Sequence, residues 1–388
     1  MLKDEIMSYK VTVLGAGLAG CEAALWLAGK GVQVTLYEQK PTHFSPAHKS
    51  AGFAELICSN SLKAERLDSA SGLLKEEMRR DGKVLIYGED IAQFGNIFVI
   101  TRGMLEEFGP KRVRNTPITE TAIIGSAIGA AETGLRPCVE LMYSDFSMVA
   151  FSEIFHCVAK WRYMHGPKYK LPLVIRNASG SSNGAGPEHS NTVESLFMHA
   201  PGLTIITPSC AYDAKGLLKS AIRSDNPVLF CEPKLLYQSK QEIPDDIYNS
   251  DYTIPIGVAD VKRPGKDVTL VAVGLMVPRA LEAAEKLAAE GIDVEVIDPR
   301  TIAPLDKDTI FNSIRKTHRA AVVEESNKTA GIGAELAAMF QEELYDELDG
   351  PVTRIAALDV PMPYNIAMEH YSIPSVDRIC ASIRAMMD

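Results

Sequence analysis

The residues whose types and spacing could do chemistry are an acid, an imidazole and a run of glycines. Glu120 stands immediately before the small-residue stretch TAIIGSAIGAAETG, where a carboxylate can either cap a helix or take part in proton transfer. His189 follows the glycine-rich stretch GSSNGAGPE, so we expect it outside the core. A neutral imidazole with a pKa of about 6.5 can move protons there.

The glycines lie near the start of the chain, in the order Gly15, Gly17 and Gly20, with Glu38 some 20 residues on. They match the G-x-G-x-x-G pattern of dinucleotide-binding loops. Gly15 permits a tight turn, Gly17 lets the backbone approach a pyrophosphate, and Gly20 lets a helix pack on a strand. A helix N-terminus would then face the phosphate charge, and Glu38 could accept hydrogen bonds from a ribose. The alternative is a glycine turn used only for packing.

The elements that must position these residues are read from hydrophobic periodicity. Residues 11–14, a helix to about 28 and residues 32–37 predict one β-α-β unit. From residue 73, helices and apolar strands alternate to about 236, which favours a parallel sheet covered on both faces. A polar stretch at 238–252 predicts a linker, and a third α/β block follows. The predicted domains are therefore 1–72, 73–237 and 253–388, joined by that linker.

Composition excludes several classes of protein. A formal net charge of −10 makes nucleic acid an unlikely partner, since no basic cluster offsets it. No apolar stretch approaches the roughly 20 residues that span a bilayer, and the first ten residues do not read as a secretory signal. The seven widely spaced cysteines fit a reduced compartment, so we expect a cytoplasmic protein.

The segment from residue 10 to 80 resembles the N-terminus of the folate- and FAD-dependent tRNA uracil-5-methyltransferases, on the strings LYEQKP, GFAELICSNSL and GLLKEEMR. The resemblance implies that Glu38 binds the adenosine ribose and that Cys58 lies near the flavin; the alternative for Cys58 is a small buried thiol. It stops near residue 80, and one β-α-β unit cannot enclose FAD. FAD is therefore a doubtful cofactor.

From residue 74 to the end, the chain resembles the beta subunit of thiamine-diphosphate-dependent 2-oxoacid dehydrogenases of the pyruvate, branched-chain or acetoin type. The motifs occur in family order and include GEDIAQFGNIFVITRGMLEEFGPKRVRNTPITE, SDFSMVAF, GAGPEHS, IDPRTIAPLD and DVPMPY. The implied fold class is α/β: a transketolase-like pyrimidine-binding domain and a transketolase C-terminal-like domain. Each has a mostly parallel sheet covered by helices, and a partial Rossmann β-α-β unit precedes them.

The resemblance assigns roles to single residues. Glu120 would bond a pyrimidine ring nitrogen of thiamine diphosphate, Phe146 would stack on that ring, and His189 would orient the acyl group and the dihydrolipoyl acceptor. Glu89 matches an inner-channel carboxylate, although a solvated strand-end residue is equally consistent. Backbone carbonyls match the monovalent-cation loop, which binds K⁺ in some members of the family; they belong to Leu173, Ala221, Ser224 and Asn226.

The resemblance also implies partners. The GDG and paired-Asn motif that holds diphosphate and Mg²⁺ is absent, so an alpha subunit would supply it in an α₂β₂ assembly that passes its acyl group to a lipoyl acyltransferase. Glu188 stands where the family usually has Gln. Both resemblances share a helix ending in L-x-EEM-R, which predicts a chimera of natural, accidental or deliberate origin. Three functions remain open: this beta subunit acting on a small 2-oxoacid or acetoin, a tRNA-methylating flavoprotein, and a scaffold whose first unit blocks assembly.

Overall fold

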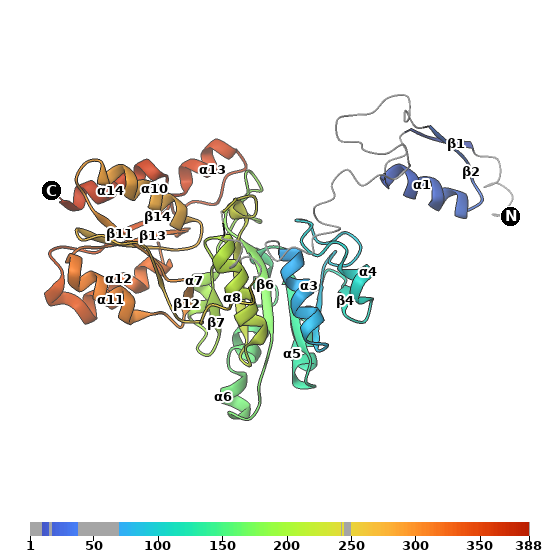
Figure 1. Ribbon diagram of the computed structural model, residues 1–388, viewed down its shortest axis with the longest axis horizontal. Helices are drawn as coiled ribbons and strands as arrows, with labels where there is room; N and C mark the ends of the chain where they lie inside the picture. The colour runs from blue at the N-terminus through green and yellow to red at the C-terminus, as the bar shows by residue number, and fades with distance from the viewer. Residues whose placement is uncertain (1–9, 15–17, 38–69, 242, 244–249, 388) are drawn as a thin grey trace. The chain divides into compact units, whose positions relative to one another are not determined.

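The computed structural model describes residues 10–14, 18–37, 70–241, 243 and 250–387. The chain forms two compact units, residues 1–64 and 65–388, which are described separately (Figure 1). Of the residues predicted to bind a flavin, Gly15, Gly17, Glu38 and Cys58 lie outside the described residues.

The N-terminal unit has the predicted β-α-β order. Strand β1 (Lys10–Leu14) leads to helix α1 (Leu18–Gly29) and strand β2 (Gln33–Tyr37), and the two strands pair in parallel. Gly20 lies in the first turn of α1. Exposed and half-buried side chains alternate along both strands, and none of the side chains described between residues 10 and 37 is fully buried.

The first half of the larger unit is built on a seven-stranded sheet in the order β12-β7-β8-β6-β5-β3-β4. All neighbours pair in parallel except β12 with β7, which is antiparallel. The strands are β3 (Val84–Gly88), β4 (Val113–Asn115), β5 (Arg136–Leu141), β6 (Val174–Ser179), β7 (Thr204–Ile206), β8 (Val228–Pro233) and β12 (Thr301–Ala303).

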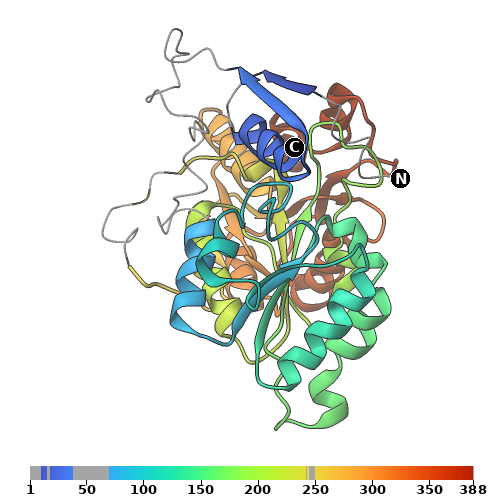
Figure 2. The same cartoon turned by 90° about the vertical axis from the view of Figure 1, so that its right-hand side faces the viewer.

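Two helical layers cover this sheet, as Figure 2 shows on either side of the strands. Helices α3 (Ala70–Arg80) and α8 (Ala211–Arg223) contact each other and share one apolar cluster with the sheet. Helix α5 (Glu120–Glu132) and the π-helix η3 (Glu153–Val158) share another cluster. The remaining short helices are α4 (Met104–Phe108), η2 (Ser144–Met148), α6 (Trp161–His165), α7 (Glu194–Met198) and η4 (Lys234–Leu236).

The second half contains a five-stranded sheet in the order β14-β13-β10-β11-β9, in which only β9 runs antiparallel to its neighbour. Figure 1 shows α10 and α14 on one face and α11 and α12 on the other. Its elements are β9 (Asp260–Arg263), β10 (Val268–Ala272), α10 (Met276–Ala288), β11 (Val294–Asp298), α11 (Lys307–Thr317), β13 (Ala320–Asn327), α12 (Ile332–Leu344), η5 (Tyr345–Glu347), β14 (Thr353–Ala357), α13 (Ile366–Ser372) and α14 (Val376–Met387).

One apolar cluster joins the two halves. It runs from Ile123 and Val139 in the first half to Val271, Val322 and Phe340 in the second. Along β3, Leu85 and Tyr87 face this cluster while Ile86 faces the cluster under α3, as the two-residue period of a strand requires. Burial on both faces explains why the parallel strands read as continuous apolar runs.

The mostly parallel α/β fold class is confirmed. Sequence periodicity did not predict β9 and β12, which are short antiparallel edge strands. Strand β12 follows the second sheet's β11 in the chain yet pairs with β7 of the first sheet, so the predicted 253–388 domain contributes a strand to its neighbour. Among the described residues, no helix is long and apolar enough to cross a membrane.

Candidate active site

The predicted site residues follow the carboxyl ends of adjacent strands, which is where open α/β sheets bind ligands. Glu89 follows β3, Phe146 lies in η2 after β5, and His189 lies in the loop after β6. Strands β3, β5 and β6 are neighbours in the sheet. Glu120 is the first residue of α5, the helix that precedes β5. The fold therefore brings residues that lie up to 100 positions apart in the sequence to one edge of the sheet.

Glu89 and Glu120 form a pair of buried carboxyls. Their exposed fractions are 7% and 6%. Burial raises the pKa of Glu89, and the negative charge of Glu120 raises it further. Oε1 of Glu89 is buried and has no hydrogen-bond partner within the described part of the chain. Glu89 therefore offers an unused polar atom to a ligand, beside a second buried carboxyl.

Phe146 and His189 lie together with Tyr143. The His189 ring meets Tyr143 edge-on with centroids 4.6 Å apart and meets Phe146 edge-on at 5.4 Å. Oγ1 of Thr121 donates a 3.1 Å hydrogen bond to the carbonyl of Val149, which links the first turn of α5 to the segment that carries Phe146. The structure therefore connects both groups of predicted residues.

Lys234 is a neighbour of the site that sequence reasoning missed. It follows β8, is 6% exposed, and donates a 2.6 Å hydrogen bond to the backbone carbonyl of His189. Burial lowers its pKa to about 8, against the opposing charges of Asp145 and Glu325. No spacing links Lys234 to His189 in the sequence, since they lie 45 residues apart.

A buried ionic network beneath the site was also missed. The Arg176 guanidinium, 1% exposed, bonds Glu140 on β5 at 2.9 Å and Glu232 on β8 at 2.8 Å. Glu140 in turn accepts a 2.6 Å bond from Nδ2 of Asn96, in the loop that Glu89 begins. A buried arginine held by two carboxylates fixes three strands and this loop in one register. Its partners lie 36 and 56 residues from Arg176, so no local pattern could reveal it.

The structure also describes Glu188 and the residues of the predicted cation loop. The Glu188 side chain is exposed beside the half-buried His189. The carbonyls of Leu173, Ala221 and Ser224 each accept a hydrogen bond from within the chain: from Val228 N at 2.9 Å, Ser224 N at 3.2 Å and Arg136 Nη2 at 2.6 Å. Each carbonyl keeps a second lone pair. Asn226 accepts a bond from Arg162 through its side chain.

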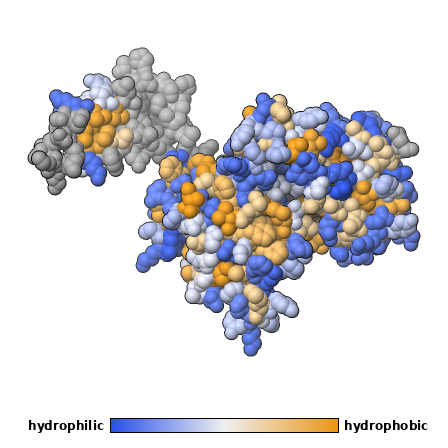
Figure 3. Space-filling model, turned by 180° about the vertical axis from the view of Figure 1, so that it is seen from behind, coloured by the Kyte–Doolittle hydropathy of each residue, from blue (hydrophilic) through white to orange (hydrophobic). Residues whose placement is uncertain are grey.

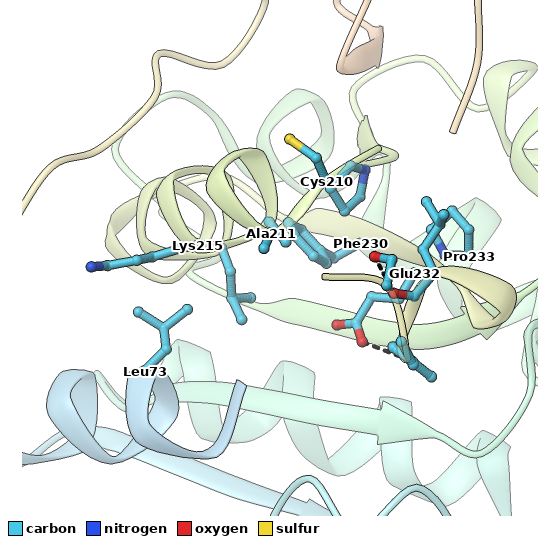
Figure 4. A pocket seen from close by; sticks show the side chains of 13 residues that line it. Leu73, Cys210, Ala211, Lys215, Phe230, Glu232 and Pro233 are labelled. Carbon is cyan, nitrogen blue, oxygen red and sulfur yellow. Dashed lines mark hydrogen bonds between the residues drawn. The ribbon is translucent and has the colours of Figure 1, made fainter. Parts of the chain in front are cut away.

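A cavity of about 190 Å³ lies beside the ionic network rather than at the predicted site (Figure 4). Leu73, Cys210, Lys215 and Phe230 line it, and Glu232 and Tyr237 join it to the network, because Tyr237 donates a 2.8 Å bond to Glu232. Burial raises the pKa of the Cys210 thiol to about 11, so this thiol is a poor nucleophile. The predicted catalytic residues do not line this cavity.

Comparison with known proteins identifies the family. Family models described as the transketolase pyrimidine binding domain and the transketolase C-terminal domain match residues 68–240 and 257–379. The beta subunit of acetoin:2,6-dichlorophenolindophenol oxidoreductase from Bacillus subtilis is 42% identical over 80% of this chain and 94% of its own length. The pyruvate dehydrogenase E1 component subunit beta-2 of Oryza sativa is 45% identical over 81% and 83% of the two chains. The chain belongs to the beta-subunit family of the 2-oxoacid dehydrogenases.

Membership of this family confirms the second resemblance and favours it over the flavoprotein alternative. The 2-oxoisovalerate dehydrogenase subunit beta of Bacillus subtilis is also 43% identical over 98% of its length. A solved structure described as a split gene transketolase, inactive beta4 tetramer, superposes with a TM-score of 0.68 at 23% identity, over 82% of this chain and 96% of that one, which supports the fold. Transketolase-like beta subunits of this kind imply thiamine diphosphate as the cofactor.

The N-terminal segment matches a different model, described as glucose inhibited division protein A, over residues 10–96. This match overlaps the pyrimidine binding domain over residues 68–96, which include α3 and β3. The overlap supports the prediction that two unrelated beginnings join within one shared helix.

Proposed function

We propose that this beta chain supplies the acid-base side chains of a thiamine-diphosphate-dependent enzyme. That enzyme would decarboxylate a 2-oxoacid oxidatively, or cleave acetoin, and transfer the acyl group to a lipoyl group. The observation that carries the proposal is the burial of Glu120 at the start of α5 beside Glu89, whose Oε1 has no partner in the described chain. A buried, unpartnered carboxyl oxygen indicates a bound group that completes its hydrogen bonds.

The side chains at this sheet edge fit thiamine diphosphate. The cofactor supplies an acidic thiazolium carbon and an aminopyrimidine that can accept its proton. Glu120 would bond a pyrimidine ring nitrogen and drive that proton transfer, a contribution of about 10²–10⁴-fold. Phe146 would offer its half-buried ring to the pyrimidine, and Glu89 would line the channel behind it. His189 would orient the acyl group and the lipoyl acceptor.

An alpha subunit is the proposed partner. Apolar side chains near the site are exposed in this chain alone: Ile118 at 82%, Val149 at 58% and Met148 at 47%. Apolar patches of this kind are typical of protein interfaces, and Figure 3 displays several on one face of the larger unit. The sequence lacks the motif that holds diphosphate and Mg²⁺, so we assign that role to the alpha subunit.

The substrate, cation and compartment belong to the same proposal. The relatives are named for acetoin, pyruvate and 2-oxoisovalerate, so the substrate class is a small 2-oxoacid or acetoin. A lipoyl acyltransferase would receive the acyl group. The carbonyls of Leu173, Ala221, Ser224 and Asn226 would bind K⁺. The described cysteines are all free, in keeping with a reduced cytoplasm.

The experiment is reconstitution with a matching alpha chain. Co-expression should give thiamine-dependent decarboxylation that Glu120→Gln lowers at least about 100-fold. Glu132→Gln is the matched control, because Glu132 is the exposed last residue of the same helix and should leave the rate unchanged. Full activity of Glu120→Gln would contradict the assigned role, and an inactive wild-type complex tested with all three substrate types would contradict the function.

A further inference from the structure

The loop that carries His189 has few backbone hydrogen bonds of its own: Gly180 N donates to the Asn191 carbonyl at 3.1 Å, and His189 N donates to the Gly186 carbonyl at 3.4 Å. Gly180, Asn183, Gly184 and Gly186 all have positive φ values, of 78°, 56°, 96° and 81°. A loop with this many left-handed residues has few regular backbone partners, and Asn183 adopts that region at an energetic cost. Contacts from outside the loop therefore contribute to its path.

Glu369 supplies the densest of these contacts. Its side chain is completely buried, on α13, a helix that begins beside the capping residue Asn365. Its Oε1 accepts the backbone N–H groups of Ser182 at 2.7 Å and Asn183 at 3.2 Å, and its Oε2 accepts that of Gly184. Three converging amides form an anion-binding nest around one carboxylate.

Other contacts from the second half hold the same stretch. Oε1 of Glu325 accepts the N–H of Ser181 at 2.6 Å. A Cβ atom at Gly186 would clash with the Tyr364 ring, so this ring lies directly on the loop backbone. After His189, the side-chain amide of Asn191 donates to Asp145 of the first half. The Thr192 hydroxyl lies 2.9 Å from that of Ser326 in the second half. His189 lies between these two anchored ends.

We propose that Glu369 is a positioning residue for His189. The hydrogen bonds given for this carboxylate go to the loop backbone and not to the imidazole. It fixes the three amides that begin the loop, and so determines where His189 meets Tyr143 and Phe146. The inference rests on the proposed function for its catalytic consequence, whereas its structural content concerns this chain alone.

The first test needs no cofactor or partner. Glu369→Gln replaces one acceptor oxygen with an N–H₂ group, which places donor against donor in the nest. In the full-length chain, amide hydrogen exchange at residues 182–184 should quicken at least about ten-fold, and the NMR signal of the His189 ring should move. Glu342→Gln, an exposed acid on α12, is the control and should change neither. Unchanged exchange together with an unmoved His189 signal would overturn the inference.

The second test is a double-mutant cycle in the complex with the alpha chain. If Glu369 acts through His189, Glu369→Gln should lower kcat for acyl transfer to the lipoyl group at least about ten-fold. The double variant with His189→Ala should then be no slower than His189→Ala alone, within about two-fold. Fully additive losses would overturn the inference. An inactive wild-type complex would contradict the proposed function and leave the exchange and NMR results to decide the role of Glu369.

Discussion

The two units of this chain use the same α/β building block and differ in what they bury. Within its described residues, 10–14 and 18–37, the N-terminal unit has one helix and two strands, and none of the side chains described there is fully buried. The larger unit has three apolar clusters and holds two sheets of five and seven strands. An isolated pair of strands is at best marginally stable, whereas covered sheets support a cooperative fold.

This difference also separates the two site predictions. The glycine loop matches a well-known spacing, and the described residues around it form a β-α-β unit within the segment that matches the glucose inhibited division protein A model, residues 10–96. Glu120 and His189 match no spacing rule, yet the larger unit gathers them at one sheet edge and buries Glu120 beside Glu89. A sequence motif such as the glycine pattern therefore indicates descent from a family. An active site also requires a fold that encloses its residues.

The largest contrast is expected from removing apolar volume in each unit. Phe340 is completely buried between α12 and the sheet and meets Phe311 edge-on at 6.2 Å. Phe340→Ala should lower the free energy of unfolding by about 3–5 kcal/mol. Leu36→Ala, at a half-buried position of β2, should change the same main denaturation transition by less than about 0.5 kcal/mol. Equal losses would mean that the two units unfold as one.

Buried carboxyls give the larger unit a pH dependence of its own. Burial raises the pKa of Glu324 to about 7, although Oε1 accepts the N–H of Gly333 at 2.8 Å. Because the unfolded carboxyl titrates at about 4.3, the folded state binds more protons between these values, and stability falls as the pH rises through them.

Glu324→Gln keeps an acceptor for Gly333 and removes this titration. Raising the pH from 4.5 to 8 should therefore lower the free energy of unfolding less in the variant than in the wild type, by about 2–3 kcal/mol. Chemical denaturation at the two pH values measures this difference. The same pH dependence of stability in both proteins would show that the pKa of Glu324 is not raised in the folded state.

Matched glycines allow a smaller comparison. Gly186 and Gly31 have nearly the same φ, 81° and 83°, but a Cβ at Gly186 meets the Tyr364 ring while one at Gly31 meets nothing within 4 Å. Gly31→Ala should cost about 1 kcal/mol from backbone strain, confined to its own unit. Gly186→Ala should cost about 2 kcal/mol in the main transition and should also quicken amide exchange in the His189 loop. Equal losses in the free energy of unfolding for the two variants would show that the Tyr364 ring does not restrict position 186.

Sequence patterns predicted the α/β alternation and many of the longer elements, because buried parallel strands and amphipathic helices leave periodic signals. The roles assigned to Phe146 and His189 came from the family resemblance, and spacing alone left Glu120 open between a helix cap and an acid-base role. The edge strands β9 and β12, Lys234, the Arg176 network and the Glu369 contacts carried no signal. Each depends on partners far away in the chain, with separations that reach 187 residues for the Glu369 contacts.

The smallest effect is expected from removing the first unit. Deleting residues 1–64 keeps α3, which begins at Ala70 and belongs to the larger unit's core. The midpoint of thermal unfolding should change by less than about 2 °C. The full chain should purify without stoichiometric flavin absorbance, since one β-α-β unit cannot enclose FAD. A yellow protein with one flavin per chain would revive the tRNA-methylating alternative.

The most direct test of the central claim is the exchange of the thiazolium proton for deuterium in the complex reconstituted with an alpha chain and thiamine diphosphate. If Glu120 drives removal of this proton, Glu120→Gln should slow the exchange at least about 100-fold while Glu132→Gln leaves it unchanged. Exchange at the wild-type rate in Glu120→Gln would contradict the account.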